Sequence, residues 1–262
     1  MNDKWNNASS YESYIGRWSR LVAIQFLDWL ESKENLDWLD IGCGTGALSN
    51  QILRSQKPHS VTGMDPSADY VEFCNKNFQD ERAKFLVGDA IATSLQQKFF
   101  DVIVSGLVLN FVSDIPKAVT EFKRVARTNA TVAAYVWDYT GKMELLRYFW
   151  DAAISLFARA RELDEGVRFP MCNPSSMHKL FSEAGYQSTE VTLIDVPTVF
   201  KDFNDLWTPF ENGQGPAPGF YQQLATYERK LLKEKIFSSL PVHPDGRIHL
   251  VARAIAVKGK VK

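Results

Sequence analysis

Along the first half of the chain, short apolar runs rich in β-branched residues alternate with longer segments whose apolar residues recur every three or four positions. The first pattern predicts buried strands, and the second predicts amphipathic helices. The expected strands are 36–41, 60–65, 84–89, 100–105 and 131–137. The expected helices are 19–32, 47–53, 68–77 and 115–125. This alternation is typical of a parallel sheet covered by helices on both faces.

After residue 141 the alternation loosens. Asn173 and Pro174 predict the start of a helix, and Gly185 predicts its end. Near the C-terminus, the tight link Asp245-Gly246 leads into a final strand and predicts that this strand is antiparallel. The remaining expected elements are a helical stretch over 142–163, a strand over 189–196, a helix near 221–232 and a strand over 247–257.

Length and composition favour one large folded domain. The chain has 262 residues, and 45% of them are hydrophobic, which is enough for a sizeable core and excludes a disordered chain. We predict a single domain over 1–262 of the α/β class, doubly wound. Two insertions, near 141–172 and 201–245, are expected to form a helical lid.

Charge and cysteine content limit the class of partner and the cellular compartment of the protein. A net charge of −1 argues against a protein that wraps nucleic acid. The three cysteines are widely spaced, without a Cys-x-x-Cys pair, which disfavours a disulfide framework or a zinc site and favours a reducing compartment. The N-terminus lacks an apolar signal core, and the longest apolar run, 102–112, is too short to span a membrane. We therefore expect a cytoplasmic protein with no membrane partner.

The strongest chemical signal is a glycine-rich turn between an expected strand and an expected helix. Gly42, Gly44 and Gly46 alternate there, so a ligand can approach the backbone and the amides of the helix that follows. Asp40 lies two positions before the first glycine. A carboxylate at that place would repel the pyrophosphate of a dinucleotide, but it suits a ligand with an ammonium group and no phosphate, such as S-adenosylmethionine.

Two further carboxylates end the next two expected strands. Asp65 lies about 20 residues beyond the loop, the spacing at which a carboxylate meets a ribose diol. Asp89 is placed to accept a hydrogen bond from an adenine amine. Each aspartate alone could simply cap a helix. Because the ends of parallel strands meet at one edge of a sheet, the three together favour a shared ligand cleft.

These segments resemble the class I S-adenosylmethionine-dependent methyltransferases, in particular their bacterial small-molecule branch. The matching segments are 39–46, 63–67, 88–90 and 100–114. The resemblance implies a mostly parallel, seven-stranded Rossmann-like sheet with an antiparallel last strand. It also implies the cofactor S-adenosyl-L-methionine, released as S-adenosyl-L-homocysteine, and no metal. The cofactor-binding residues carried over are Asp40, Gly42, Cys43, Gly44, Asp65, Pro66, Asp89, Ala90, Ser105 and Leu107.

The N-terminal segment 1–32 is dense in aromatic and charged groups before and within the first expected helix. In methyltransferases of this kind such a segment often folds over the cofactor. We therefore hypothesise that Tyr14, Arg17 and Trp18 close the site, with Arg17 near the methionine carboxylate. Alternatively, the residues before the first expected helix only pack against that helix.

The methyl acceptor is less constrained by the sequence. The fourth strand ends in Ser105-Gly106-Leu107-Val108, which lacks the motifs of methylases that act on nucleic-acid bases. We expect a small-molecule acceptor, and the aromatic residues of the insertions provide either lid core or a pocket for an aromatic or partly apolar acceptor. Asn110 could orient the acceptor or cap a turn, and His243 is a candidate base.

Two other functions fit parts of the pattern. Residues 42–47 also match the G-x-G-x-x-G/A pattern of NAD(P)-dependent oxidoreductases, although Asp40 argues against a pyrophosphate. A catalytically silent module that binds the cofactor or a partner could have the same fold, since fold does not determine function.

Overall fold

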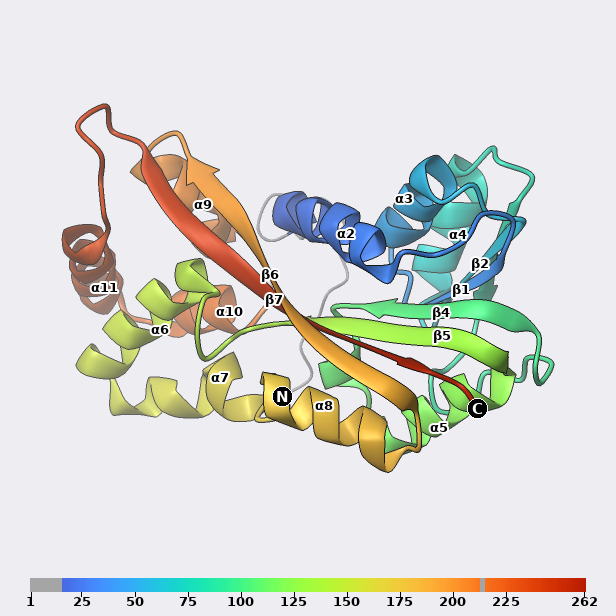
Figure 1. The fold of residues 1–262 in the computed structure, drawn as a ribbon. Helices are drawn as coiled ribbons and strands as arrows, with labels where there is room; N and C mark the ends of the chain where they lie inside the picture. The colour runs from blue at the N-terminus through green and yellow to red at the C-terminus, as the bar shows by residue number, and fades with distance from the viewer. Residues whose placement is uncertain (1–15, 213–214) are drawn as a thin grey trace. The chain divides into compact units, whose positions relative to one another are not determined.

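The computed structural model describes residues 16–212 and 215–262. Contacts within the chain divide it into two compact units. We call the first the sheet unit; it contains Val22–Val136, Asn173–Ile194 and Ala254–Lys262. We call the second the helical unit; its described part contains 16–21, Trp137–Cys172 and Asp195–Arg253. Figure 1 labels most of the helices and strands of both units.

Within the described residues, seven strands form one sheet in the order β3-β2-β1-β4-β5-β7-β6. The strands are β1 (Asp37–Ile41), β2 (Ser60–Asp65), β3 (Ala83–Val87), β4 (Phe100–Gly106), β5 (Ala126–Trp137), β6 (Gln187–Phe200) and β7 (Ile248–Lys260). The first five pair in parallel. The last strand is reversed, because Asn129 N–H donates to Val261 O at 2.8 Å and Asp138 N–H donates to Arg253 O at 2.9 Å. The predicted fold class is confirmed.

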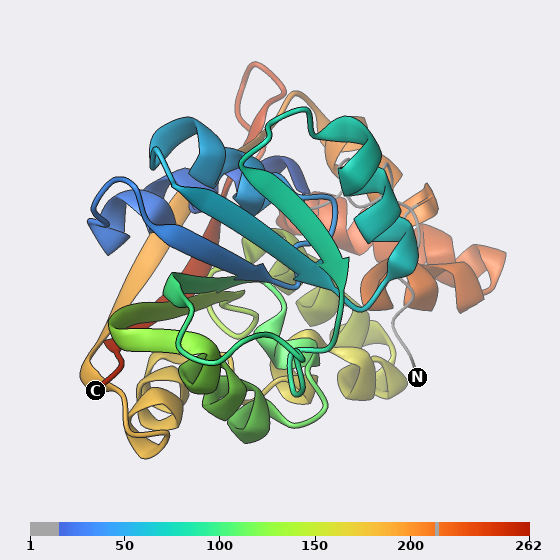
Figure 2. The ribbon, with the colours of Figure 1, turned by 90° about the vertical axis from the view of Figure 1, so that its right-hand side faces the viewer.

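Helices cover both faces of the sheet in the sheet unit. Figures 1 and 2 show α3 and α4 on one face and α5 and α8 on the other. The bounds are α2 (Arg17–Leu30, entering from the helical unit), α3 (Ala47–Ser55), α4 (Ala68–Asn77), α5 (Ile115–Val125) and α8 (Pro174–Glu183). A 3-10 turn, η2 (Leu109–Phe111), follows β4.

Side-chain caps set the starts of these helices where the sequence predicts them. Asp114 accepts the N–H of Lys117 at 3.0 Å, and Asn173 accepts the N–H of Ser176 at 2.9 Å. Such caps satisfy backbone donors that the first helical turn leaves unpaired. Gly185 follows α8 with φ +76°, a conformation that favours glycine.

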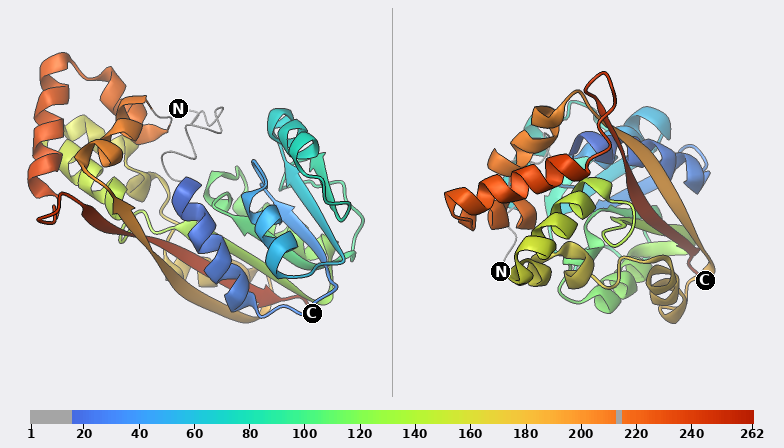
Figure 3. Two further views of the ribbon diagram at one scale, coloured as in Figure 1. Left: turned by 90° about the horizontal axis from the view of Figure 1, so that it is seen from above. Right: turned by 90° about the vertical axis from the view of Figure 1, so that its left-hand side faces the viewer.

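The helical unit is built around an aromatic cluster. Its helices are α6 (Glu144–Leu156), η3 (Ala158–Leu163), α7 (Glu165–Arg168), α9 (Phe203–Asn212), α10 (Pro216–Gln223) and α11 (Thr226–Ser239). Figure 3 shows α11 alongside α6. Phe149 of α6 stacks on Phe210 of α9 at 4.8 Å between ring centroids, and both rings are 1% exposed. Phe149 and Phe210 therefore form core packing.

Two helix predictions in this unit are wrong in detail. The helix expected near 221–232 is interrupted, because α10 ends at Gln223 and α11 begins at Thr226. The Glu228 carboxylate accepts the N–H of Ala225 at 2.9 Å, so a new helix start is stabilised there. The helical stretch expected over 142–163 is broken at Phe157, whose backbone is extended. None of the described helices is long and apolar enough to cross a membrane.

Candidate functional site

The glycine loop joins β1 to α3 in the sheet unit. Gly42 N–H and Cys43 N–H both donate to the carbonyl of Met64, at 2.7 and 3.0 Å, so the loop is fastened to the end of β2. Gly44 has φ +51°, and a Cβ built on it would meet nothing within 4 Å. The loop therefore has a rigid backbone with open space beside Gly44, where a ligand can approach the main chain.

Gly42 has a different neighbour. A Cβ at Gly42, whose φ is +76°, would lie 2.5 Å from the side chain of Val108. The segment after β4 thus packs directly on the glycine loop. The side chain of Cys43 lies in a small cluster with Val71, Cys74 and Phe85.

Asp65 ties the end of β2 to this loop. Its Oδ2 accepts the N–H of Gly44 at 2.9 Å, and its Oδ1 accepts the N–H of Ser67 at 2.9 Å. The residue is 8% exposed. Each carboxylate oxygen can accept more than one hydrogen bond, so both oxygens retain capacity for the two hydroxyls of a ribose.

Asp40 is buried at the end of β1, 1% exposed. Ser49 of α3 donates its hydroxyl to Asp40 Oδ2 at 2.6 Å. Loss of hydration raises the pKa of Asp40 to about 7, hydrogen bonds from Ser49 oppose that rise, and the nearby charge of Asp65 adds to it. A buried carboxyl of this kind is suited to a ligand that brings positive charge.

Asp89 and Ala90 follow β3. The Asp89 carboxylate accepts the N–H of Ile91 at 3.0 Å, while Ala90 is 8% exposed. The turn is attached to β2, because Gly88 N–H donates to Asp65 O at 3.1 Å. The sheet unit therefore brings the turns after β2 and β3 together, with one carboxylate on each; Pro66, next to Asp65, is exposed.

The end of β4 carries two unpaired polar side chains. The hydroxyl of Ser105 and both amide atoms of Asn110 are buried without a hydrogen-bond partner. Leu107 has φ +62°, and its N–H donates to the carbonyl of Tyr135 at 2.8 Å. The segment is thus held by its backbone, in a conformation that is uncommon for leucine.

Two of the three N-terminal candidates, Arg17 and Trp18, lie within the described residues. Tyr14 falls outside the described residues. Arg17 and Trp18 belong to the helical unit, where Arg17 Nη1 lies 3.2 Å from Asp205 Oδ1 and its guanidinium stacks over Trp18 and Phe200. Nε and Nη2 of Arg17 are buried without a partner. The role of this segment in closing the site stays a prediction.

The base candidate His243 also belongs to the helical unit. Its side chain is 67% exposed, and its Nδ1 lies 3.6 Å from a carboxylate oxygen of Asp245. Among the described residues, no group of three or more His, Cys, Asp or Glu side chains could hold a metal ion. The role of His243 stays a prediction.

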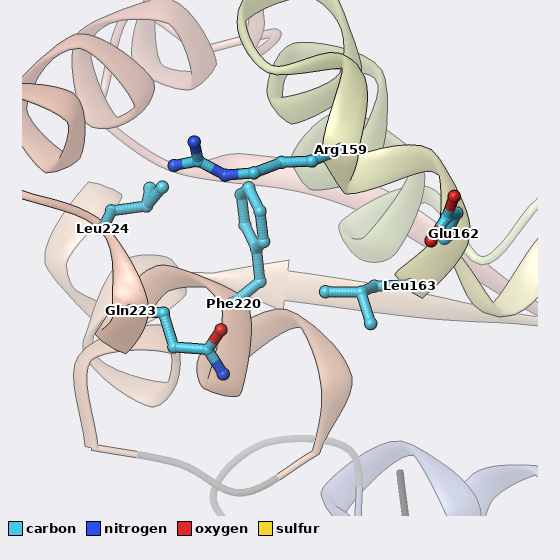
Figure 4. A pocket seen from close by; sticks show the side chains of 6 residues that line it. All are labelled: Arg159, Glu162, Leu163, Phe220, Gln223 and Leu224. Atoms are coloured by element: carbon cyan, nitrogen blue, oxygen red, sulfur yellow. The ribbon is translucent and has the colours of Figure 1, made fainter.

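A cavity of about 490 Å³ lies in the helical unit, within the two insertions for which the sequence predicts either lid core or a pocket. Figure 4 shows Arg159 extended across it, near Phe220 and Leu224. Arg159 Nη2 lies 3.0 Å from Glu228 Oε1. The six lining residues are Arg159, Glu162, Leu163, Phe220, Gln223 and Leu224. No motif links them, since they come from helices that approach one another only in the folded chain.

Comparisons with known proteins agree with the geometry of the sheet unit. Residues 39–134 match the family model described as a methyltransferase domain. The chain is similar to the malonyl-[acyl-carrier protein] O-methyltransferase of Acetivibrio thermocellus, with 25% identity over 179 residues, 68% of this chain and 62% of that protein. It is also similar to the demethylmenaquinone methyltransferase of Roseiflexus castenholzii, with 29% identity over 169 residues, 60% of this chain and 70% of that protein.

The fold has close counterparts among solved structures. Phosphoethanolamine N-methyltransferase 2 of Haemonchus contortus, solved in complex with S-adenosyl-L-methionine, superposes with a TM-score of 0.61 and 15% identity. The superposition covers 97% of this chain and 56% of that one. The chain therefore has the fold of these methyltransferases, with the same reversed last strand, and residues 39–134 match a methyltransferase domain.

Proposed function

We propose that this protein transfers a methyl group from S-adenosyl-L-methionine to a small-molecule acceptor. The observation that carries the proposal is the link between Asp65 and Gly44. It places a carboxylate with spare acceptor capacity against a loop that has open space beside its backbone. When bound, the cofactor supplies the methyl group on a positively charged sulfur.

The residues of the sheet unit fit this cofactor. Asp65 would accept hydrogen bonds from the ribose hydroxyls, and Asp89 from the adenine amine. Asp40 would stabilise the ammonium group of the cofactor. The buried charge of Asp40 is stabilised by hydrogen bonds from Ser49, and the positive charge of the ligand would add to that stabilisation. Further contacts are proposed through the backbone of Gly42, Cys43 and Gly44, and through Pro66, Ala90, Ser105 and Leu107.

We propose that the acceptor is partly apolar. The two relatives named above act on malonyl-[acyl-carrier protein] and demethylmenaquinone, respectively, as their names state. A cytoplasmic location stays a prediction.

Radiolabel transfer tests the proposal. The protein is incubated with S-adenosyl-L-methionine carrying a tritiated methyl group and with one of three acceptors: malonyl-coenzyme A, 1,4-naphthohydroquinone or octanoate. We expect label in at least one product. Binding of S-adenosyl-L-homocysteine without transfer to any acceptor would instead favour the catalytically silent module.

A further inference from the structure

Asn110 has a buried amide with no hydrogen-bond partner. The residue is 7% exposed, and neither Nδ2 nor Oδ1 makes a hydrogen bond. Leaving a buried donor or acceptor unpaired destabilises the folded protein. An uncharged apolar side chain of similar size would avoid that cost, so the amide is expected to have a partner in the working protein.

The amide does not serve the local backbone. The turn η2 is closed by Phe111 N–H, which donates to Val108 O at 2.8 Å, and Val108, which precedes the turn, provides no side-chain cap. The segment is further held by the hydrogen bond of Leu107 to Tyr135. The interpretation of Asn110 as a cap of this turn is therefore wrong, because the turn forms without its side chain.

The position of Asn110 places it next to the cofactor loop. Val108, two residues earlier, fills the space beside Gly42 so closely that a Cβ there would clash at 2.5 Å. The 3-10 turn that carries Asn110 begins at the next residue, Leu109. The unpaired amide thus lies two residues after the side chain that packs against Gly42, and all of these residues belong to the sheet unit.

We propose that Asn110 is a positioning residue that binds the methyl acceptor. The inference rests on the proposed function. The amide would donate a hydrogen bond through Nδ2 and accept one through Oδ1. The molecule that receives the methyl group would therefore carry a hydrogen-bonding donor group close to a hydrogen-bonding oxygen, as in a hydroxyl beside a carbonyl. An amide does not titrate in the physiological pH range and cannot take a proton from the methyl acceptor. Its contribution is alignment of the attacking atom.

The test uses Asn110→Leu, which keeps the approximate size and removes both polar groups. Thr62→Val is the matched control, because Thr62 also has a buried, unpaired hydroxyl and lies in β2 of the same unit. We expect both variants to unfold at or above the wild-type temperature and to bind S-adenosyl-L-homocysteine with wild-type affinity. Only Asn110→Leu should lose kcat for methyl transfer, by about 100-fold, as misalignment at a reacting centre does.

Each other outcome overturns the inference in a defined way. A fall in the unfolding temperature of Asn110→Leu would show that the amide stabilises the fold. A fall in S-adenosyl-L-homocysteine affinity would place Asn110 on the cofactor. Unchanged transfer by Asn110→Leu would remove its role while the proposed function stands, whereas absence of transfer by the wild-type protein would contradict the proposed function and with it the inference.

Discussion

The carboxylate of Asp65 accepts the backbone N–H of Gly44 at 2.9 Å, across 21 positions of sequence. This bond connects the carboxyl end of β2 to the open part of the glycine loop. A side chain that binds a ribose would therefore also hold the loop that receives the methionine part of the cofactor. Binding of the two halves of the ligand is expected to depend on this one residue.

Replacement of Asp65 tests that dependence. Asp65→Ala removes a charged acceptor for two hydroxyls, and hydrogen bonds to charged groups contribute about 1.5–3 kcal/mol each. We expect the affinity for S-adenosyl-L-homocysteine, measured by calorimetry, to fall at least about 10-fold. Asp69→Ala is the control, because Asp69 is an exposed carboxylate in the first turn of α4. Equal affinities of the two variants would rule out Asp65 as the ribose ligand.

Cofactor affinity is expected to depend on pH through Asp40. Burial raises the pKa of this carboxyl to about 7 in the free protein, and a bound ammonium group would lower it. Binding at pH 6 should therefore release a proton, and affinity should increase as pH rises towards about 7 and then level off. Calorimetry from pH 5.5 to 8 in two buffers measures both effects. In Asp40→Asn the pH dependence should disappear; its persistence would assign it to another group.

The stability of the helical unit is expected to respond to pH through Glu165. This carboxyl is fully buried in α7, where it accepts a hydrogen bond from the indole of Trp150, and burial raises its pKa from 4.5 to about 7. The folded state therefore binds the proton more tightly than the unfolded state, and stability falls as pH rises from 4.5 to 7. A rise of the pKa of Glu165 from 4.5 to about 7 corresponds to about 3 kcal/mol.

Glu165→Gln should remove this pH dependence. We expect the variant to gain stability over the wild-type protein as pH increases through 4.5 to 7, in denaturant titrations at several pH values. Glu162→Gln is the matched control, since Glu162 lies three residues away on the surface. A wild-type slope that Glu165→Gln leaves unchanged would show that Glu165 does not titrate in this range.

The predicted role of Arg17 in cofactor binding can be tested by comparing variants of Arg17 and of its ion-pair partner, Asp205. If Arg17 binds the methionine carboxylate, Arg17→Ala should weaken S-adenosyl-L-homocysteine binding, because a charge-assisted contact is lost. Asp205→Asn breaks the same ion pair and retains the guanidinium. Loss of affinity in Arg17→Ala alone supports the cofactor role. Equal loss in both variants would indicate that Arg17 acts only through packing within the helical unit.

Local sequence signals predicted much of the sheet unit. The limits of α4 and α5 match the predicted 68–77 and 115–125, because Ser67 and Asp114 cap them through their own side chains. The glycine loop was found because its positive φ angles require glycine, which is visible in one sequence. These features depend on interactions between near neighbours in the chain.

The features that sequence could not predict depend on distant contacts. The unpaired amide of Asn110 and the packing of Val108 on Gly42 follow from how β1 and β4 lie together in the sheet. The lining of the cavity in the helical unit combines side chains of η3 and α10 with the side chain of Leu224, the residue after α10. The break between α10 and α11 depends on the contact of Glu228 with Ala225. In the sequence, that pair is a weak signal for a helix start compared with the apolar helical pattern around it.

Calorimetric titration of the wild-type protein with S-adenosyl-L-homocysteine, and separately with NAD, tests the assignment of S-adenosyl-L-methionine as the cofactor. The two ligands share an adenosine but differ in that one carries an amino acid and the other a pyrophosphate. We expect saturable binding of S-adenosyl-L-homocysteine at one site per chain and no measurable binding of NAD. Binding of NAD without binding of S-adenosyl-L-homocysteine would contradict the assignment.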